Sequence, residues 1–335
     1  MLFEKLAADH VRCGICERRC LLQVGQDGFC KTRRNIDGDL YTLVYGDISS
    51  ISANPIEKKP FFHFWPGSYA LTIGTWSCNF LCPWCQNWEI SKYPPNPQKA
   101  EYVDPEQLVK MTLKEKCQGV SISFNEPTLL FEYSLDLFPL ARRNGLYNTY
   151  VSNGYMTSEA LKALRDAGMD AIKFDMKGST ETYREYCGAN ADIVWRNIAE
   201  SRRLGMHTEV VTLLIPGVND GDSQIQEISM RHLKAAGPET PLHFTRFHPN
   251  YKMTNRPSTP VSTLERAHGI AKKEGVLYVY IGNVPGHKLE NSYCHSCGTL
   301  LIQRYGFAVA KYAISDDGKC PKCNETIPIV GHYVG

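Results

Sequence analysis

The feature that most limits the fold is a regular alternation that begins at residue 69. Short runs rich in β-branched and aromatic residues are expected strands, at 69–76, 118–124, 147–152, 171–176, 207–215 and 242–247. Between them lie stretches with apolar residues at helical spacing, at 104–117, 131–144, 157–167, 179–204 and 222–236. Several runs are continuously apolar, which predicts a parallel sheet covered by helices. We expect an α/β fold, a partial (β/α)6 TIM-like barrel, with a helix at 261–274 and a further edge strand at 276–281.

Composition allows a sizeable core and excludes some partners. The chain has 335 residues, of which 43% are hydrophobic and 21% charged, which fits one large domain with appendages or two domains. A formal net charge of +2 gives no basic field that would attract nucleic acid or an anionic membrane. No run approaches the length of a membrane span, and the first residues do not resemble a secretion signal. We therefore expect a cytoplasmic protein.

The cysteines are grouped. Eleven of the 13 cysteines fall into three groups, and only Cys117 and Cys187 stand alone. In a reducing compartment, grouped cysteines predict metal or cluster ligands rather than disulfides. The two isolated cysteines are expected to be small buried hydrophobic residues.

The central group is Cys78, Cys82 and Cys85, directly after the first expected strand. Thiolates at such short spacing on a loop can converge on one iron–sulfur cluster. A 4Fe–4S cluster takes four ligands and this loop offers three, so one iron would stay open for another ligand, as in catalytic metal sites. The alternatives are a zinc site or inert thiols. Zinc is less favoured because no adjacent residue supplies a fourth ligand.

The two outer groups each contain four cysteines. The N-terminal group is Cys13, Cys16, Cys20 and Cys30, whose irregular spacing is compatible with either structural zinc or an auxiliary cluster. The C-terminal group is Cys294, Cys297, Cys320 and Cys323. Its paired Cys-x-x-Cys units, separated by a β-rich segment, predict a zinc-ribbon or rubredoxin-like site for zinc or iron.

These groups suggest three units. We expect an N-terminal four-cysteine segment with a β connector at 1–66, a core barrel at 67–290 and a C-terminal ribbon at 291–335. Within the first unit, residues 36–66 are expected to form a small β excursion, followed by a connector at 54–64 across the mouth or base of the barrel. Lys58, Lys59 and His63 in this connector either contact substrate or are solvated loop residues.

Polar residues stand at the ends of several expected strands, where active sites of parallel sheets lie. They are Asn125, Glu126 and Thr128 after the second strand, Ser152 and Asn153 after the third, Lys173, Asp175 and Lys177 at the fourth, and Arg246 and His248 at the sixth. By alternation the three charged residues of the fourth strand share one face, and charges that point into a barrel need partners. Arg246 and His248 suit an anionic or peptide substrate.

Simpler roles remain open for several of these residues. Asn125 or Thr128 can cap a helix. Asn153 stands before a glycine and can form a turn. Lys177 can lie on the surface, and His248 can be an ordinary loop histidine.

The motif Cys78-x-x-x-Cys82-x-Trp84-Cys85 resembles the cluster motif of the radical S-adenosylmethionine (SAM) superfamily. The resemblance implies that a 4Fe–4S cluster binds these cysteines, that SAM chelates the open iron and that Trp84 packs near the adenine. It also implies reductive cleavage of SAM to a 5′-deoxyadenosyl radical, which takes hydrogen from a protein or small-molecule substrate. The electron would come from a donor such as flavodoxin or ferredoxin.

The same resemblance suggests roles for the strand ends. Asn125-Glu126-Pro127 is similar to the Gly-Gly-Glu-Pro motif that grips the SAM amino group, although asparagine replaces the second glycine. Ser152 and Asn153 match a segment of glycyl-radical-enzyme activases that meets the SAM ribose or carboxylate. Asp175 and Lys177 match an Asp-Leu-Lys motif that contacts SAM, substrate and, in some members, a cation. We expect Asp175, Lys177, Arg246 and His248 to serve the chemistry.

Taken together, the segments resemble the radical SAM enzyme of the AmmeMemoRadiSam system, a relative of pyruvate formate-lyase activating enzymes. The segments are 59–67, 78–88, 125–128, 175–177, 243–247 and 282–286. This resemblance implies Memo-like and AMMECR-type partners. One alternative is an activase that installs a glycyl radical on another enzyme. Another is a non-catalytic metal-ribbon or RNA-binding protein, which the near-neutral charge disfavours.

Overall fold

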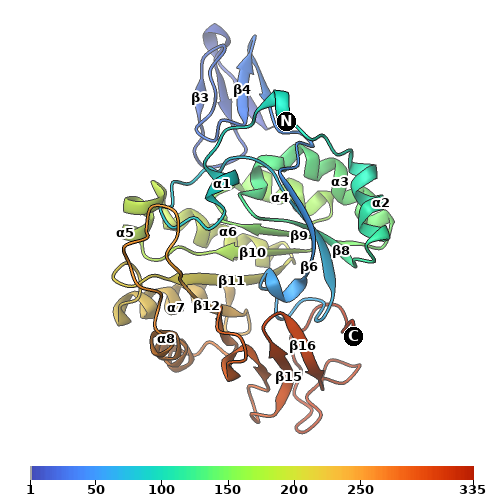
Figure 1. The fold of residues 1–335 in the computed structure, drawn as a ribbon, viewed down its shortest axis with the longest axis vertical. Helices are drawn as coiled ribbons and strands as arrows, with labels where there is room; N and C mark the ends of the chain where they lie inside the picture. Colours follow the sequence, from blue (N-terminus) through green and yellow to red (C-terminus); the bar gives the residue numbers. More distant parts are fainter. Residues whose placement is uncertain (1) are drawn as a thin grey trace.

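The computed structural model describes residues 2–335. A central sheet of eight strands runs in the order β13-β12-β11-β10-β9-β8-β7-β6, with β7 to β13 parallel and β6 antiparallel to β7 (Figure 1). The strands are β6 (Ser50–Pro55), β7 (Tyr69–Gly74), β8 (Gly119–Ile122), β9 (Tyr147–Ser152), β10 (Ala171–Asp175), β11 (His207–Leu214), β12 (Leu242–Arg246) and β13 (Val279–Gly282). The expected α/β fold with a parallel sheet is confirmed.

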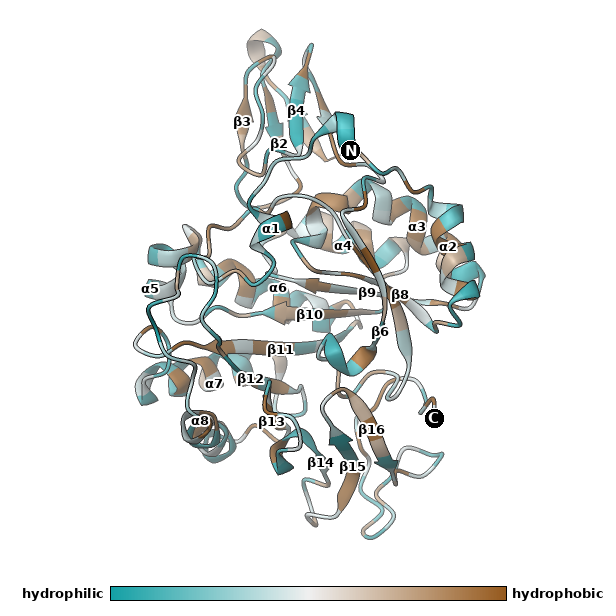
Figure 2. Ribbon diagram, viewed as in Figure 1, coloured by the Kyte–Doolittle hydropathy of each residue, from teal (hydrophilic) through white to brown (hydrophobic). Residues whose placement is uncertain are grey.

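Helices connect successive parallel strands. They are α2 (Pro105–Lys114), α3 (Phe131–Arg143), α4 (Ser158–Ala167), α6 (Ala191–Arg203), α7 (Asp222–Ala236) and α8 (Val261–Glu274). Thr157 caps α4 by accepting a hydrogen bond from the Ala160 amide, and Gly168, at a φ of 115°, ends it in the left-handed conformation. α2 and α3 carry both brown and teal residues in Figure 2, as expected of helices with one face against a core.

Two local predictions need revision. β6 lies in the region 36–66, which was expected to form a small β excursion, but it joins the main sheet as its antiparallel edge. Half of its residues are exposed, so no apolar alternation marks it as a strand of that sheet. The helix expected at 179–204 is interrupted. It divides into α5 (Thr180–Thr182), the π-helical turn η5 (Tyr183–Cys187) and α6, because Gly188 adopts a φ of 58° and Asn190 caps the next helix.

The two ends of the chain form small sheets at opposite ends of the molecule (Figure 1). The N-terminal sheets contain β1 (Phe3–Lys5), β2 (Val11–Cys13) and β3 (Leu21–Leu22), and β4 (Arg33–Ile36) with β5 (Asp39–Thr42). The C-terminal sheet contains β14 (Ser292–Tyr293), β15 (Leu300–Tyr305) and β16 (Ala308–Tyr312). The unit boundaries after 66 and 290 remain predictions.

Buried side chains attach both ends to the sheet. Arg33 is 2% exposed and forms an ion pair with Glu132 of α3 at 2.5 Å. Arg304 of β15 is also 2% exposed and donates a hydrogen bond to the Phe62 carbonyl at 2.8 Å. Buried arginines paired in this way fix each small sheet against the core.

No helix among residues 2–335 is long and apolar enough to cross a bilayer.

Candidate functional site

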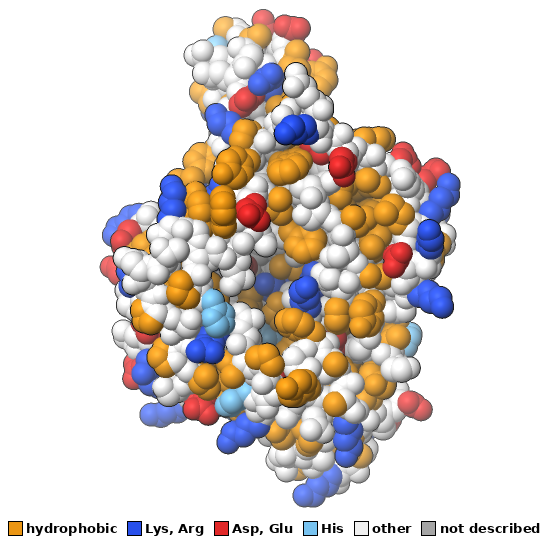
Figure 3. Space-filling model, viewed as in Figure 1, with side chains coloured by type: hydrophobic (Ala, Val, Ile, Leu, Met, Phe, Trp, Pro, Cys, Tyr) orange, Lys and Arg blue, Asp and Glu red, His pale blue; other side chains and the backbone are white. Residues whose placement is uncertain are grey.

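A cavity of about 280 Å³ lies at the carboxyl ends of the parallel strands. The space-filling view shows the molecule hollowed near its centre, where basic side chains are visible (Figure 3). Predicted site residues that line this cavity come from four loops or strands, and they are Cys78, Cys82, Trp84, Cys85, Asn125, Glu126, Asn153, Asp175 and Lys177. The fold therefore brings most of the predicted site to one place.

The central cysteines lie on the loop that follows β7. Cys82 is 7% exposed, and its sulfur lies 3.6 Å from the sulfur of Cys187 in η5. The neighbouring Cys187 thiol, together with Lys177 and Lys92, lowers the pKa of Cys82 to about 7. Since the thiolate is the form that binds metal, this environment favours ligation. No local pattern in the sequence indicates that Cys187 lies beside Cys82.

The sulfurs of this loop are not gathered as closely as the ligands of a single ion. Among residues 2–335, only the C-terminal cysteines form a group whose ligand atoms all lie within 4.8 Å of one another. Thiolates on a cluster bind different irons and so lie farther apart than thiolates on one ion. In addition, the buried Trp84 indole nitrogen has no hydrogen-bond partner in the described chain, and Trp84 lines the cavity. The loop thus leaves room and a free donor beside the three thiols.

Glu126 joins the ends of β8 and β9. It is 1% exposed, and burial raises its pKa. Its Oε1 accepts a hydrogen bond from the Ser152 hydroxyl at 2.7 Å, and its Oε2 accepts one from the Asn153 amide at 2.9 Å. Ser152 does not line the cavity. It holds Glu126, and Glu126 and Asn153 face the cavity.

Asn125 ties the second strand end to the cysteine loop. Its Oδ1 accepts a hydrogen bond from the Thr75 amide at 3.1 Å, and its Nδ2 donates one to the Ser77 carbonyl at 2.8 Å. These two bonds occupy the side chain in positioning the residues that precede Cys78. Asn125 also lines the cavity.

The charged residues of β10 face the cavity together. Lys177 and Asp175 form an ion pair at 2.6 Å. Lys173 is 4% exposed and lines the same cavity. Burial lowers the pKa of Lys173 to about 8, and the nearby Asp175 opposes this shift. The pair and the lysine supply positive charge and a carboxylate at the cavity floor.

Two predicted residues lie elsewhere. Arg246 donates a hydrogen bond from Nε to the Thr259 carbonyl at 2.8 Å, and His248 is exposed with its Nδ1 3.1 Å from the Ser258 hydroxyl. Neither lines the cavity. Along β12 the side chains alternate, so His243 and Thr245 point inward and Arg246 does not.

Several cavity residues have no local signal in the sequence. Glu57 comes from the short helix η2 (Ile56–Lys58), and Lys92 follows the cysteine loop. Lys58 of η2, which the sequence offered as a substrate contact, lines the cavity as well. Phe307, in the turn between β15 and β16, reaches the cavity from the C-terminal sheet. Only tertiary packing brings these segments together. Of the other connector residues, Lys59 donates to Asn54 Oδ1 at 2.8 Å.

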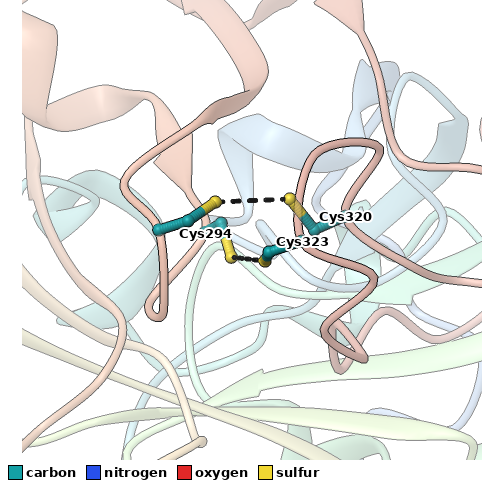
Figure 4. Close-up of side chains that lie close together, drawn as sticks. Cys294, Cys320 and Cys323 are labelled. Carbon is teal, nitrogen blue, oxygen red and sulfur yellow. Dashed lines mark hydrogen bonds between the residues drawn. The ribbon is translucent and has the colours of Figure 1, made fainter.

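The C-terminal cysteines form a compact group in which the sulfur atoms turn toward one another (Figure 4). The Cys294 and Cys323 sulfurs are 3.5 Å apart, and those of Cys297 and Cys320 are 3.7 Å apart. In a tetrahedron with metal–sulfur bonds of 2.3 Å the sulfurs would be about 3.8 Å apart. These four residues fit one zinc or iron ion, and the geometry is the same for both metals.

The N-terminal cysteines are arranged differently. Cys13, Cys16 and Cys30 are buried and Cys20 is partly exposed. No three of their sulfurs meet the 4.8 Å spacing found in the C-terminal group, within residues 2–335. The two four-cysteine groups are therefore not equivalent.

Comparisons with known proteins agree with this site. Residues 73–227 match the radical SAM superfamily. The uncharacterized protein MJ0808 of Methanocaldococcus jannaschii is 43% identical over 331 residues, covering 98% of each chain. MJ1632 of the same organism, named as a candidate glycyl-radical enzyme activating enzyme, is 25% identical over 56% of this chain and 67% of its own.

A solved structure supports the fold. A radical SAM methyltransferase from Sphaerobacter thermophilus aligns with a TM-score of 0.52 over 71% of each chain, at 14% identity. The superfamily implies a 4Fe–4S cluster and SAM, and the cysteine loop with its cavity fits both. The chain thus belongs to the radical SAM superfamily, whose members are enzymes, and to the same family as MJ0808.

Proposed function

We propose that this protein is a radical SAM enzyme whose cluster binds Cys78, Cys82 and Cys85 and whose SAM occupies the adjoining cavity. One observation carries the proposal: the three cysteines and the polar ends of β8, β9 and β10 line a single cavity. When bound, the cluster and SAM would supply a 5′-deoxyadenosyl radical that abstracts hydrogen from a protein or small-molecule substrate.

The residues of the cavity would bind and orient SAM. Glu126, held by Ser152, presents Oε2 toward the cavity beside the Asn153 amide, and this carboxylate suits a SAM amino group. Trp84 offers an apolar face and a free indole N–H near the adenine. Asp175 and Lys177, paired at 2.6 Å, would contact SAM or the substrate and hold a proton in a fixed place. Burial of these groups excludes water from the reacting atoms.

The cavity offers lysines that can bind an anionic group of the substrate. Lys58, Lys92 and Lys173 line it in addition to the Asp175–Lys177 pair. Glu57, Glu126 and Glu290 also line it, so the formal charges of the lining balance and the lysines act locally. An anion that reaches Lys173 would stabilise the charged form of this buried lysine.

The finer assignment is the AmmeMemoRadiSam radical SAM enzyme, which rests on the motif segments and would make Memo-like and AMMECR-type proteins its partners. A second candidate is a glycyl-radical-enzyme activase, which the similarity to MJ1632 favours. The two differ in product. An activase leaves a stable glycine-centred radical on a partner enzyme, visible by electron paramagnetic resonance (EPR), and a small-molecule enzyme does not.

The test is anaerobic reconstitution with iron and sulfide, reduction with a low-potential donor of the flavodoxin or ferredoxin class, and an assay for 5′-deoxyadenosine. The Cys82→Ala variant is expected to lose about four irons and at least about 100-fold of 5′-deoxyadenosine production. Cys117→Ala is the matched control, because Cys117 is buried away from the cavity. Production retained in Cys82→Ala would overturn the proposal. In the wild-type protein, transfer of deuterium from a labelled candidate substrate into 5′-deoxyadenosine would identify the substrate.

A further inference from the structure

Two buried donors near the N-terminal cysteines lack acceptors. Arg33 Nη1 pairs with Glu132 and Nη2 donates to the Leu129 carbonyl at 3.1 Å, but Nε has no partner in the described chain. Asn79 is fully buried, and its Nδ2 also has none. An unpaired buried donor costs about 1–3 kcal/mol. Two such donors beside one group of cysteines point to an acceptor at that place.

The fold brings the N-terminal cysteines close together along the chain. Across β2 and β3 the Cys13 amide donates to the Cys20 carbonyl at 3.0 Å. The Cys20 sulfur accepts a hydrogen bond from the Phe29 amide at 3.4 Å, and Phe29 precedes Cys30. Cys16 lies in the turn between β2 and β3. All four cysteines therefore lie on neighbouring segments of the N-terminal region.

The unpaired donors lie close to these cysteines. Arg33 is beside Cys30, because the Gly28 amide, two residues before Cys30, donates to the Arg33 carbonyl at 2.8 Å. Asn79 is beside the segment that carries Cys16, because Arg18, two residues after Cys16, donates to the Asn79 carbonyl at 3.0 and 2.9 Å. Neutral thiols are weak acceptors, whereas thiolates and sulfide accept N–H groups well.

The spacing separates a cluster from a single ion. In the C-terminal group the sulfurs approach to 3.5 and 3.7 Å, as one tetrahedral ion requires. No three of the N-terminal sulfurs gather within 4.8 Å of one another in the described chain, although their segments are neighbours. A polynuclear cluster, on which each thiolate binds its own iron, fits the wider arrangement. Its negative charge would also be balanced by buried Arg33.

We propose that Cys13, Cys16, Cys20 and Cys30 bind a second iron–sulfur cluster, and that Asn79 links it to the cluster site at Cys78. Asn79 stands directly after Cys78. Its Oδ1 lies 3.9 Å from the Cys78 sulfur and accepts a hydrogen bond from Asn153 Nδ2 at 2.7 Å. Its Nδ2 has no partner in the described chain, and its carbonyl binds Arg18, two residues after Cys16. Asn79 therefore lies between the two cysteine groups.

Arg18 fixes this connection. Its Nε and Nη2 donate to the Asn79 carbonyl at 3.0 and 2.9 Å, and Nη2 also donates to the Cys187 carbonyl at 3.0 Å. Its guanidinium lies 4.1 Å from the centre of the Phe29 ring, next to Cys30. The N-terminal segment and the central loop are held together at this point.

The link implies a path for one electron. A donor of the ferredoxin or flavodoxin class would reduce the N-terminal cluster, which would be oxidised again as it reduces the cluster at the central loop. Only this transfer rests on the proposed function, since binding of the second cluster follows from the N-terminal residues alone.

The first test separates the two cysteine groups. The combined Cys78→Ala, Cys82→Ala, Cys85→Ala variant, reconstituted anaerobically, is expected to keep about four irons and four sulfides per chain and an EPR signal after reduction. Adding Cys13→Ala and Cys16→Ala to this variant should remove the remaining irons and sulfides and the EPR signal. Far-ultraviolet circular dichroism checks that each variant is folded. If a variant does not fold, the iron content of the wild type decides: about eight irons per chain indicate two clusters, and about four indicate one.

Zinc in place of iron in the combined variant, or no metal beyond the C-terminal ion, would overturn the inference. Wild-type iron that disappears with the three central cysteines would do the same and leave the proposed function intact. Conversely, loss of 5′-deoxyadenosine with N-terminal iron retained would identify a failure of the proposed function alone.

The second test addresses Asn79. Hydrogen bonds to the sulfurs of an iron–sulfur cluster affect the reduction potential of the cluster. In the combined variant, Asn79→Leu should move the midpoint potential of the N-terminal cluster to a more negative value. In the fully reduced wild type, the EPR signals of the two clusters should be broadened by spin coupling. Two results together would show that Asn79 does not link the sites. They are an unchanged midpoint potential of the N-terminal cluster in Asn79→Leu and a wild-type EPR spectrum that is the sum of two uncoupled signals.

Discussion

Lys173 shows how a single residue can report on the cavity. It is 4% exposed at the cavity floor, and burial lowers its pKa from 10.5 to about 8. A lysine whose pKa is lower in the folded state binds fewer protons there than in the unfolded chain. Between these two pKa values the free energy of unfolding therefore rises with pH. Below pH 8 the buried lysine is charged, and the full loss of stability is present.

Lys173→Met is therefore expected to raise the free energy of unfolding below pH 8 by up to about 3 kcal/mol. The gain should shrink above that pH and disappear near pH 10.5. Urea unfolding across this pH range measures it. Lys162→Met, at a side chain that is 66% exposed, should show no such dependence. A constant or negative difference for Lys173→Met would mean that bound water or an anion already satisfies the lysine.

Among the elements, β11 connects the sheet to the segment that precedes β7. Its Glu209 is fully buried and accepts hydrogen bonds from the Phe62 and His63 amides at 2.9 and 2.8 Å. The rings of His207 and His243 approach the same carboxylate at 2.9 and 2.6 Å. Burial alone would raise the pKa of Glu209, but the two histidines hold it well below its usual range. The carboxylate thus fastens the connector to the base of the barrel.

Glu209→Gln should destabilise the protein by about 2–4 kcal/mol at pH 7. The glutamine side-chain N–H₂ would then face the backbone N–H groups and histidine rings that now bind the carboxylate. A depressed carboxyl pKa contributes stability above the unfolded value of about 4.3, and this contribution is lost as the pH falls through the folded value. The difference between wild type and variant should therefore narrow below about pH 4. Thermal unfolding from pH 3 to 7 measures it, and a difference that does not change with pH would contradict the role given to the charge.

The β14–β16 sheet is expected to depend on its own metal. Cys320→Ser should remove about one zinc or iron per chain and speed amide hydrogen exchange in residues 292–312, with the central cluster retained. Exchange in β9 serves as the internal reference. Equal protection in the variant and the wild type would show that the four cysteines stabilise the sheet without metal. Since Phe307 lines the cavity, loosening this sheet should also open the site to solvent.

At the scale of the molecule, the sequence predicted the elements better than the site. The core strands and helices carry clear local periodicity, and the three cysteine groups are visible in the printed sequence. The place of β6 in the main sheet was not predicted, because an exposed edge strand lacks that periodicity. Phe307, Lys92 and Glu57 reach the cavity only through packing of distant segments, which no local pattern records.

The same limit applies to side-chain direction. Arg246 and His248 were expected at the cavity, but neither lines it: Arg246 lies on the other face of β12, and His248 lies beyond the end of that strand. The spacing of the cysteines could not distinguish a single ion from a cluster. The distances between sulfurs set the compact C-terminal group apart from the other two, and the unpaired donors support the cluster proposed for the N-terminal group.

The central claim is that the cluster at Cys78, Cys82 and Cys85 has an open iron facing the SAM cavity. EPR spectra of the reduced, reconstituted protein before and after addition of SAM test it most directly. We predict that SAM changes the g values of one 4Fe–4S signal, and that Cys82→Ala abolishes this SAM-sensitive signal. A spectrum that SAM leaves unchanged, in protein that holds its full complement of iron, would contradict the account.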